Sequence, residues 1–558
     1  MSKEDCVAKL IGGDVELANF ILGQSDIAGK SDREASRLLL AEVDGMPGHH
    51  TNGNGSQGVG SVIVDSDDYN YWGATAQSGY SSQDWGRKYL PANGGCIYID
   101  LNHLELATPE VLSARDHQAV WTAMLRIARE AQVTVNAELP PERRVVVLAN
   151  NSDRQGNSYG AHQSFLMSRT AWDNMIRQRM IPTLFYLMAY QVSSIVFTGQ
   201  GKAGSENGQP YVPFQISQRA DFMETLIGEQ TTYHRPLINT RDEPLCGPAG
   251  RLQGTPPPGD RYARLHVIFY DANLAPVATF LKVGVMQLIL TMIEAGAVDD
   301  SLILESPLVA LHEWSRDPDL TTVNPLMSGE NVTAVDLQCR FLEQAQEFDA
   351  RHGFAEFVPD ATQILELWGD TLMKLQARDF PSLRGRLDWL MKRSVLQQSI
   401  DAHPDWEWDS PELTYLDQIY SSIDPADSLF LALDAEGLIE SLATETEIAG
   451  FVTEPPENTR AWTRAMLLRA AGRNRVAAAD WDRIELKSPN GHSQRIHIPL
   501  PDPLGATKSD AQQAFSKAPN LSLLLKELSR VGINAQARRN DVIESAVSLL
   551  DSYGIRHF

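Results

Sequence analysis

Three stretches of the chain alternate apolar and polar residues with a period of two, which is typical of half-buried β-strands. They cover residues 7–16, 96–100 and 262–270. In the second stretch, Ile97 and Ile99 fall on one face, and Tyr98 and Asp100 fall on the other. The isoleucines are expected to face the core, so Tyr98 and Asp100 face a polar space. Together the three stretches predict one sheet with a polar concave face that is backed by helices on its other side.

Apolar residues at helical spacing predict helices between and after these strands. One helix is expected over 109–132, with Thr108 as its N-cap and Pro109 at its first position. Another is expected over 165–180, and His162 just before it is interpreted as a cap or core residue. The apolar run 280–293 is short for a membrane span and predicts a buried helix. Further helices are expected over 334–349, 361–377, 383–400 and 509–558, and a strand over 144–148.

A segment rich in Gly, Asn, Ser and His precedes the strand that carries Tyr98 and Asp100. We expect residues 43–92 to form a long mobile loop that gates a site, because this composition offers little apolar surface to bury. A chain of 558 residues is too long for one simple core. The expected division is a catalytic domain over 1–440, a small C-terminal domain over 441–515 and a helical extension over 516–558.

The net charge of −24 argues against a general nucleic-acid surface or an anionic-membrane surface. The four cysteines are far apart and show no paired metal spacing, which suits a reducing compartment. No apolar run near the N-terminus has the length of a signal peptide. We therefore expect a cytoplasmic protein that acts as a monomer, without nucleic-acid or membrane partners.

Carboxylates cluster on the predicted strands. Asp14 and Glu16 lie two residues apart and share a face, where they repel each other unless a cation or a donor lies between them. Asp100 lies on the polar face of its strand, and Glu105 follows just past the end of that strand. This pattern fits a divalent cation beside a phosphate group. The alternative is a solvated sheet edge followed by an ordinary helix cap.

Basic residues join the carboxylates. Arg264 and His266 share a face of their strand, and a histidine among carboxylates fits a divalent metal, whereas the arginine fits a phosphate. Arg241 follows a predicted strand piece and either pairs with the neighbouring acids or meets a phosphate. The glycine-rich residues 199–204 lack the full phosphate-loop pattern and are interpreted as a turn.

These motifs, taken together, resemble the family of Pup ligases and Pup deamidases/depupylases, which is related to glutamine synthetase and the carboxylate–amine ligases. The similarity runs from about Lys9 to Ala514 and is carried by several separated segments. These segments are 11–16, 93–108, 150–169, 214–221, 238–244, 264–273, 384–393 and 478–482.

The resemblance implies an α+β fold, with a glutamine-synthetase-like curved antiparallel sheet packed by helices and a small C-terminal domain. It also implies that ATP or ADP binds with Mg²⁺ in the cradle of the sheet. Asp100 matches the catalytic aspartate of the family. The implied metal ligands are Asp14, Tyr98, Glu105, His162 and His266. The implied nucleotide contacts are Gly12, Gly13, Glu16, Thr108, Arg241, Arg264 and Trp481.

The two branches of this family perform opposite reactions. The ligase phosphorylates the C-terminal glutamate of Pup and joins it to a lysine, and the depupylase cleaves that isopeptide bond or deamidates a C-terminal glutamine. Four residues separate Asp100 from Glu105, as in the depupylase branch, whereas the ligase has one more. The long preceding loop and the segments 214–221 and 271–274 also favour the depupylase.

The resemblance therefore implies a hydrolase whose partners are Pup, or a Pup-like protein, and Pup-tagged proteins. An ATP-dependent carboxylate–amine ligase, or a divergent relative with another substrate, is the alternative. A third possibility is a catalytically inactive binding protein for a Pup-like tail, which the retained metal and catalytic residues argue against.

The chain departs from the family pattern at several positions. Asp14 stands where the family has Glu, which shortens the ligand arm, and Leu245 stands where a His is usual. Gln163-Ser164-Phe165 replaces Glu-Asn-Tyr. Cys96 stands where the family has a nucleotide-contacting Arg, so we expect weaker nucleotide binding than is usual for the family.

Overall fold

The computed structural model describes residues 6–24, 30–48, 85–178, 180–246, 261–488 and 494–539. Most of the predicted mobile loop, residues 49–84, lies outside the described residues. Its two ends are described and are ordered strands, β2 (Met46–Pro47) and β3 (Trp85–Tyr89). The loop prediction is therefore wrong for these ends, because β3 pairs with the strand that carries Tyr98 and Asp100.

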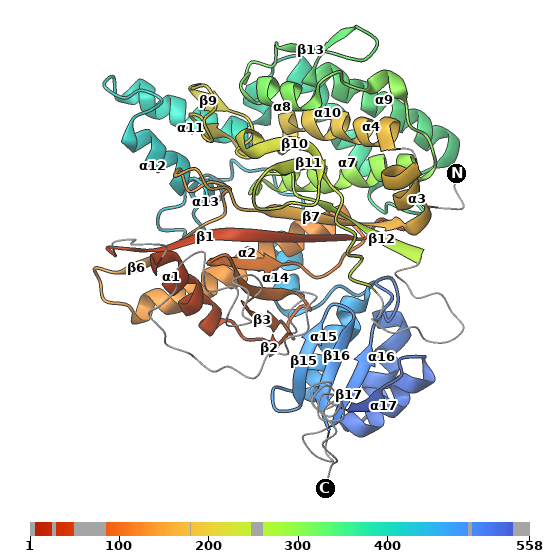
Figure 1. Cartoon of the computed structure of the whole chain (residues 1–558). Coiled ribbons are helices and arrows are strands. Elements are labelled where there is room, and N and C mark those ends of the chain that lie inside the picture. The colour runs from red at the N-terminus through yellow and green to blue at the C-terminus, as the bar shows by residue number, and fades with distance from the viewer. Residues whose placement is uncertain are drawn as a thin grey trace, which may run out of the picture.

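An eight-stranded antiparallel sheet forms the centre of the molecule (Figure 1). Its order is β12-β7-β1-β5-β4-β3-β2, and β6 pairs with the other end of β1. The remaining strands are β1 (Ile11–Leu22), β4 (Cys96–Asp100), β5 (His103–Ala107), β6 (Arg144–Leu148), β7 (Ala161–Ser168) and β12 (Tyr262–Val267). All three alternating stretches contribute a strand to this sheet, as the sequence predicts, but residues 7–10 and 268–270 lie outside the strands and β1 continues to Leu22.

Helices cover the apolar face of the sheet. Ile97 and Ile99 are 0% and 5% exposed and join one core with α2 (Ala114–Glu138) and α7 (Pro276–Glu294). In the described part of the chain, α7 alone is long and apolar enough to cross a membrane, but 94% of its apolar window is buried inside the protein. It is the buried helix that the sequence predicts.

Figure 1 shows α7 to α10 gathered above β1 and the small C-terminal domain below it. The other helices of the larger part are α1 (Lys30–Glu42), α3 (Arg169–Asp173), α4 (Met180–Ser193), α5 (Ile195–Thr198), α8 (Pro307–Ser315), α9 (Ala334–His352), α10 (Ala361–Gln376), α11 (Asp388–Ala402), α12 (Pro411–Ile419), α13 (Leu429–Ala435) and α14 (Glu445–Thr453). Three short sheets complete it: β8 (Lys202–Ala203) with β9 (Phe214–Gln215), β10 (Met223–Gly228) with β11 (Arg235–Asn239), and β13 (Val323–Pro325) with β14 (Asn331–Thr333).

Two local predictions are wrong. Thr108 does not cap a helix, because α2 begins at Ala114 and Ser113 accepts the capping hydrogen bond from Asp116 N–H. Residues 165–168 are not helical but belong to β7, which also contains His162. β7 pairs with β1 on one side and with β12 on the other, so sheet pairing overrides the local helical pattern there.

The described residues of the small C-terminal domain form four antiparallel strands and three helices with a separate apolar core. Its elements are α15 (Arg460–Ala471), β15 (Val476–Asp480), β16 (Arg483–Lys487), β17 (Gln494–Pro499), α16 (Lys508–Lys517), α17 (Leu521–Arg530) and β18 (Gln536–Arg539). β18 pairs with β17, so the predicted all-helical C-terminal extension is wrong at these residues. α14, which the sequence places in the small domain, packs instead on α2.

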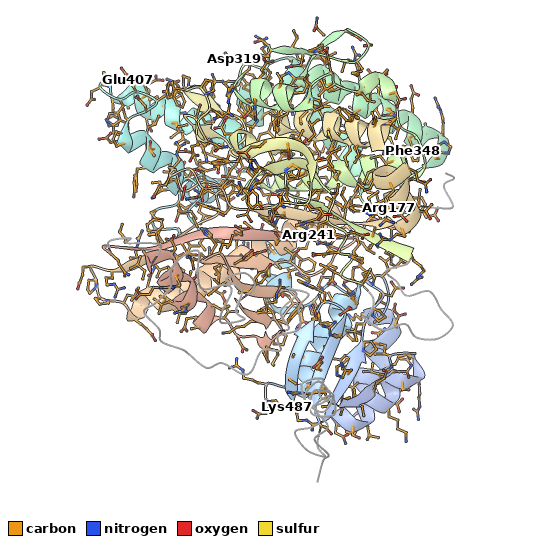
Figure 2. The ribbon with its side chains drawn as sticks, in the orientation of Figure 1. Arg177, Arg241, Asp319, Phe348, Glu407 and Lys487 are labelled. Carbon is orange, nitrogen blue, oxygen red and sulfur yellow. The ribbon has the colours of Figure 1, made fainter. Side chains whose placement is uncertain are left out.

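Figure 2 shows how the side chains fill these layers, with Arg241 next to the central sheet and Lys487 in the small domain. The small domain also contacts the sheet directly. Its core cluster includes Tyr89, Cys96 and Tyr98, so β3 and β4 are packed on one side by the small domain.

Candidate active site

A cavity of about 1200 Å³ lies on the polar face of the central sheet. Its lining includes every site residue that the sequence predicts: Gly12, Gly13, Asp14, Glu16, Tyr98, Asp100, Glu105, Thr108, His162, Arg241, Arg264, His266 and Trp481. They come together because β12, β7, β1, β5 and β4 are consecutive in the sheet and each turns alternate residues to the cavity. Trp481 reaches the cavity from the small domain.

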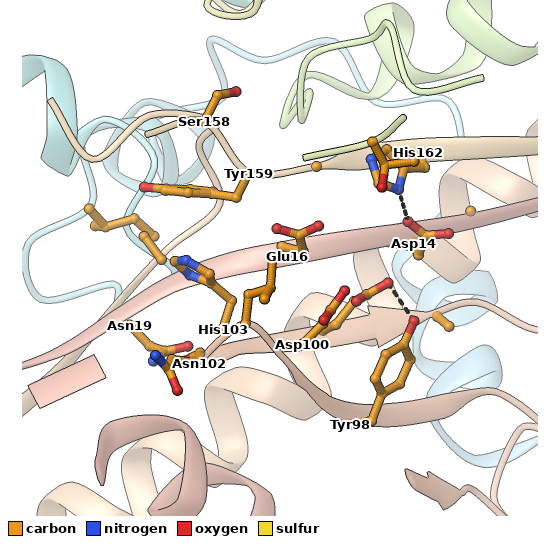
Figure 3. Close-up of a pocket in the computed structure, with 18 of the residues that line it drawn as sticks. Asp14, Glu16, Asn19, Tyr98, Asp100, Asn102, His103, Ser158, Tyr159 and His162 are labelled. Atoms are coloured by element: carbon orange, nitrogen blue, oxygen red, sulfur yellow. Dashed lines mark hydrogen bonds and ion pairs between the residues drawn. The ribbon is translucent and has the colours of Figure 1, made fainter. Parts of the chain in front are cut away.

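One group within the cavity combines a carboxylate with two imidazoles. Single ligand atoms of Asp14, His162 and His266 all lie within 4.8 Å of one another. Asp14 and His162 are opposite each other on β1 and β7, and His162 Nδ1 lies 2.9 Å from Asp14 Oδ1 (Figure 3). The two histidine rings meet edge to face, with centroids 5.0 Å apart.

The electrostatic surroundings keep this group ready to bind a cation. Burial lowers the pKa of His266 well below its usual value, and the nearby Arg264 lowers it further, so the imidazole is neutral at pH 7. Burial of Asp14 opposes its ionisation, but His162, Arg264 and Arg87 outweigh that effect and lower its pKa. A neutral imidazole and an ionised carboxylate are the forms that coordinate metals.

A second group contains three carboxylates. Oxygens of Glu16, Asp100 and Glu105 lie within 4.8 Å of one another. Glu16 is opposite Glu105 on β1 and β5, and Tyr98 is opposite Glu105 on β4, with its hydroxyl donating to Glu105 Oε1 at 2.5 Å. Burial, reinforced by the charges of Asp14 and the other carboxylates, raises the pKa of Glu105 well above its usual value.

This carboxylate group fits Mg²⁺, which prefers oxygen ligands and offsets the mutual repulsion of the carboxylates. The five residues that the sequence assigns to metal thus do not share one centre. Asp14, His162 and His266 form one group, whereas Glu105 and Tyr98 belong to the other. Glu16, which the sequence assigns to the nucleotide, lies in the carboxylate group together with Asp100.

A tight hairpin fixes the position of Asp100. Asp100 and His103 are the closing pair of β4 and β5, and only Leu101 and Asn102 lie between them. Both of these residues have positive φ, 46° and 75°, as the two-residue turns that best fit the twist of a hairpin require. The four-residue spacing between Asp100 and Glu105 is therefore the consequence of this short turn.

Two arginines line the cavity and are the candidate groups for an anion. Arg264 on β12 is partly buried, and its guanidinium donates to Ser164 Oγ at 3.1 Å and to Glu243 O at 2.7 Å. Thr108 Oγ1 accepts a hydrogen bond from Gly13 N–H at 2.9 Å, which ties the end of β5 to β1. Arg241 lies at the edge of the cavity, 3.9 Å from Glu243, so it forms the ion pair that was one of its two predicted roles.

The small domain closes one end of the cavity. The ring of Trp481 meets Tyr89 edge to face at 5.3 Å, and the guanidinium of Arg464 lies 4.9 Å from the centre of the indole. Tyr89 in turn donates to Asp480 Oδ1 at 3.3 Å. Trp481 is thereby held in one orientation beside the cavity.

The sequence prediction missed Arg87, which lines the same cavity from β3. Its guanidinium lies 3.9 Å from the centre of the Tyr98 ring. The available signal was the short run Trp85–Tyr89, in which aromatic residues flank a possible strand directly before a Gly-rich turn. The loop-like composition upstream concealed it.

The chain matches the family model described as Pup-ligase protein over residues 60–485. This match covers more than half of the chain and includes β4, β5, β7 and β12, whereas β1, which carries Asp14 and Glu16, precedes the matched range. The chain belongs to the Pup ligase/depupylase family. The α+β fold expected from the sequence is confirmed by this family's solved structures.

Relatives from both branches of the Pup ligase/depupylase family are similar to the chain. A depupylase of Acidothermus cellulolyticus is 35% identical over 439 residues, which cover 78% of this chain and 82% of the relative. A Pup deamidase/depupylase of Mycolicibacterium smegmatis is 33% identical over 438 residues, with the same coverage of both chains. A Pup–protein ligase of Acidimicrobium ferrooxidans is 32% identical over 429 residues, covering 76% of this chain and 88% of the relative.

Solved structures of a Pup ligase have the same fold. The ligase PafA in complex with Pup aligns with a TM-score of 0.72 and 26% identity, covering 92% of this chain and 93% of that chain. PafA in complex with ADP aligns with a TM-score of 0.66 and 29% identity, covering 78% of this chain and 90% of that chain. The chain is thus an enzyme of this family, and its structural relatives include nucleotide-bound and Pup-bound proteins.

Proposed function

We propose that this protein is a depupylase and deamidase that works with a bound Mg²⁺–nucleotide. Its reaction is hydrolysis of the isopeptide or amide bond at the C-terminal Glu or Gln of Pup or a Pup-like tail. The observation that carries the proposal is the position of Asp100, at the end of a two-residue hairpin and beside Glu16 and Glu105. This spacing resembles the depupylase branch. The sequence identities of this chain to depupylases and to ligases are too similar to decide between the branches.

Both groups in the cavity suit the binding of divalent cations. We assign the oxygen-rich group and the Asp14 group to divalent cations, because their ligand atoms converge within 4.8 Å. Bound Mg²⁺ would neutralise these carboxylates and polarise phosphate oxygens. The residues assigned to metal are Asp14, Glu16, Tyr98, Glu105, His162 and His266. The residues assigned to ATP or ADP are Gly12, Gly13, Thr108, Arg241, Arg264 and Trp481.

Asp100 is the group assigned to bond cleavage. It is partly exposed to the cavity, so a substrate carbonyl can approach it. In one route its carboxylate attacks the side-chain carbonyl carbon, the C–N bond breaks, the amine leaves with a proton, and water hydrolyses the resulting anhydride. In the other route Asp100 accepts a proton from water, which attacks the carbonyl directly. Both routes need Asp100 ionised.

The deciding experiment compares wild type with Asp100→Asn on a Pup-tagged protein and on a Pup-like peptide that ends in glutamine. We expect cleavage to fall by roughly three orders of magnitude or more, as for loss of a nucleophile or base, while nucleotide binding survives. Asp319→Asn is the matched control, because Asp319 is an exposed carboxylate paired with Arg393 on the surface far from the cavity (Figure 2). Wild-type cleavage by Asp100→Asn would overturn the assignment.

The ligase reaction is the second candidate, because the family model and both aligned structures are those of Pup ligases. A ligase consumes one ATP for each bond that it forms between a glutamate side chain and a lysine. Incubation of wild type with ATP, a Pup-like peptide ending in glutamate and an acceptor protein distinguishes the two. Stoichiometric ADP production with a new covalent product would establish the ligase. We propose a cytoplasmic location and a monomer for either activity.

A further inference from the structure

Arg87 enters the cavity from a strand that the sequence pattern does not reveal. It is 8% exposed, and its guanidinium lies 3.9 Å from the centre of the Tyr98 ring. Tyr98 is itself fixed, because its hydroxyl donates to Glu105 at 2.5 Å. Arg87 is therefore a preorganised cation, stacked on an aromatic ring at the wall of the candidate active site.

Arg87 and Arg264 line the same cavity from opposite parts of the sheet. Arg264 lies on β12 at one edge, and Arg87 lies on β3 next to the other edge. Asp14, on β1 between these two strands, lines the same cavity. An anion that binds beside Asp14, for example through a shared cation, therefore lies between two arginines rather than beside one.

Cys96 leaves β4 without a positive charge that the family resemblance implies at this position. It stands where the family resemblance implies a nucleotide-contacting arginine on β4. Here the thiol is fully buried in the core of the small domain, next to Tyr89, its direct partner on β3. Position 96 thus supplies no charge to the cavity. Arg87, two residues before Tyr89, supplies a guanidinium from the neighbouring strand.

We propose that Arg87 binds a phosphate group of the nucleotide and, with Arg264, forms a two-sided phosphate clamp. In this clamp Arg87 on β3 supplies the positive charge, because Cys96 on β4 supplies none. The inference rests on the proposed function, since it requires that a nucleotide binds in this cavity. It also changes one expectation from the sequence, because nucleotide affinity need not fall with the loss of arginine at position 96.

Calorimetry with ADP and adenosine in the presence of Mg²⁺ tests the clamp. Arg87→Met is expected to weaken ADP binding by about 10- to 100-fold, the effect of one hydrogen-bonded charge pair. Adenosine carries no phosphate, so its affinity should change by less than about twofold. Arg87→Lys keeps the charge but lacks the planar guanidinium, so its affinity for ADP should lie between those of wild type and Arg87→Met.

Arg473→Met is the matched control, because Arg473 is an exposed arginine paired with Asp44 near the same edge of the molecule. It should bind ADP like wild type. The double variant Arg87→Met/Cys96→Arg returns the positive charge to β4. Recovery of ADP affinity in this variant would support the inference that Arg87 replaces an arginine at position 96. Thermal unfolding of each variant shows whether it is folded.

The outcomes separate this inference from the proposed function. If wild type binds ADP and Arg87→Met binds it equally well, the clamp is wrong and the proposed function stands. An equal loss for ADP and adenosine would show that Arg87 only positions Tyr98, which also overturns the clamp. A loss confined to a Pup-like peptide would assign Arg87 to a substrate carboxylate instead. If wild type binds neither ADP nor adenosine, the clamp and the nucleotide-dependent function are both wrong.

Discussion

At the scale of single residues, Glu105 shows how the carboxylates of the site oppose one another's ionisation. Its carboxylate is buried beside two other carboxylates, and burial and their charges raise its pKa. A hydrogen bond from Tyr98 offsets this only in part. Without a cation, Glu105 therefore keeps its proton to a higher pH than an ordinary glutamate does, and a metal ion would compete with that proton.

The first prediction follows from this competition. The rise in unfolding temperature on addition of Mg²⁺ should grow as the pH is raised from 5 to 8, since Glu105 must be deprotonated to bind the ion. Differential scanning calorimetry at fixed ionic strength measures it. Glu105→Gln should reduce both the Mg²⁺ effect and its pH dependence. An Mg²⁺ effect that is constant across this pH range would contradict the coupling.

Most of the candidate site could be predicted from residue types at even spacing, because a strand turns every second side chain to the same face. Asp14, Glu16, Tyr98 and Asp100 were found in this way. Which of them are neighbours could not be predicted, since strand register depends on pairing between segments distant in sequence. The pairing of Glu16 with Glu105 is an example.

At the scale of elements, the length of the turn in the β4–β5 hairpin determines where Asp100 and Tyr98 lie relative to Glu105. The turn of Leu101 and Asn102 leaves Tyr98 directly opposite Glu105 and Asp100 directly before the turn. A longer turn can keep the strands paired through a bulge, but it re-aims the residue beside it. A change in turn length can therefore move Asp100 while Tyr98 and Glu105, the proposed metal ligands, stay paired.

The second prediction is that one glycine inserted between Leu101 and Asn102 lowers the rate of depupylation by about 100-fold, because displacement by an ångström suffices for such a loss. The unfolding temperature should change by only a few degrees, since the sheet remains paired. A glycine inserted beside Gly329, in the β13–β14 hairpin far from the cavity, is the control. Depupylation at the wild-type rate would show that the turn does not position Asp100.

The third prediction concerns the cavity side and the core side of β1. A Cβ at Gly13 would lie 2.9 Å from His117 Cε1 and 3.0 Å from Gln163 Oε1, both fully buried. Gly13→Ala should destabilise the protein by about 1–3 kcal/mol, as overpacking of a core does. At Gly12 the nearest atom would be Ser164 Cβ at 3.8 Å, so Gly12→Ala should cost less than Gly13→Ala. Urea unfolding curves measure both, and equal costs would argue against overpacking at Gly13.

Other elements could not be predicted from local pattern. β7 contains a helix-like apolar spacing, yet it is a strand because β1 and β12 pair with both of its edges. Thr108 fits a helix cap by type, but its hydroxyl bonds to Gly13 and the helix begins six residues later, at Ala114. In both cases contacts with distant segments overrule local preference.

At the scale of the whole molecule, one buried ion cluster joins the small domain to the sheet. Glu110, which follows β5, pairs with Arg460 at 2.8 Å and also with Arg464, both on α15. Burial opposes the ionisation of Glu110, but Arg464 and Arg460 outweigh it and lower its pKa to about 2. Arg464 also touches Trp481, so this cluster sets where the small domain closes the cavity.

The fourth prediction is an acid-sensitive domain contact. Because the pKa of Glu110 is lowered, its stabilising contribution is complete above its unfolded value near 4.5 and is lost as the pH falls toward 2. Glu110→Gln removes the charge at every pH and should cost about 3–5 kcal/mol, since two buried arginines lose their partner. The free energies of unfolding of wild type and Glu110→Gln, measured by urea unfolding, should become more similar as the pH falls from 6 to 3.

The exposed pair of Glu454 and Arg469 provides the matched control for that prediction. Glu454→Gln should change the free energy of unfolding by less than about 1 kcal/mol, as is usual for exposed pairs. If Glu110→Gln is equally mild, the small domain is held by its apolar contacts alone.

The place of β1 in the sheet has a consequence for how the protein is made. β1 (Ile11–Leu22) is translated before the other described strands, yet it pairs with β5, β6 and β7, the last of which ends at Ser168. At ordinary translation rates β1 waits roughly 10–30 s for these partners. Trp481 is translated far later still, so the lining of the cavity is complete only after the small domain has been made. We expect newly made β1 to depend on ribosome-associated chaperones until its neighbours arrive.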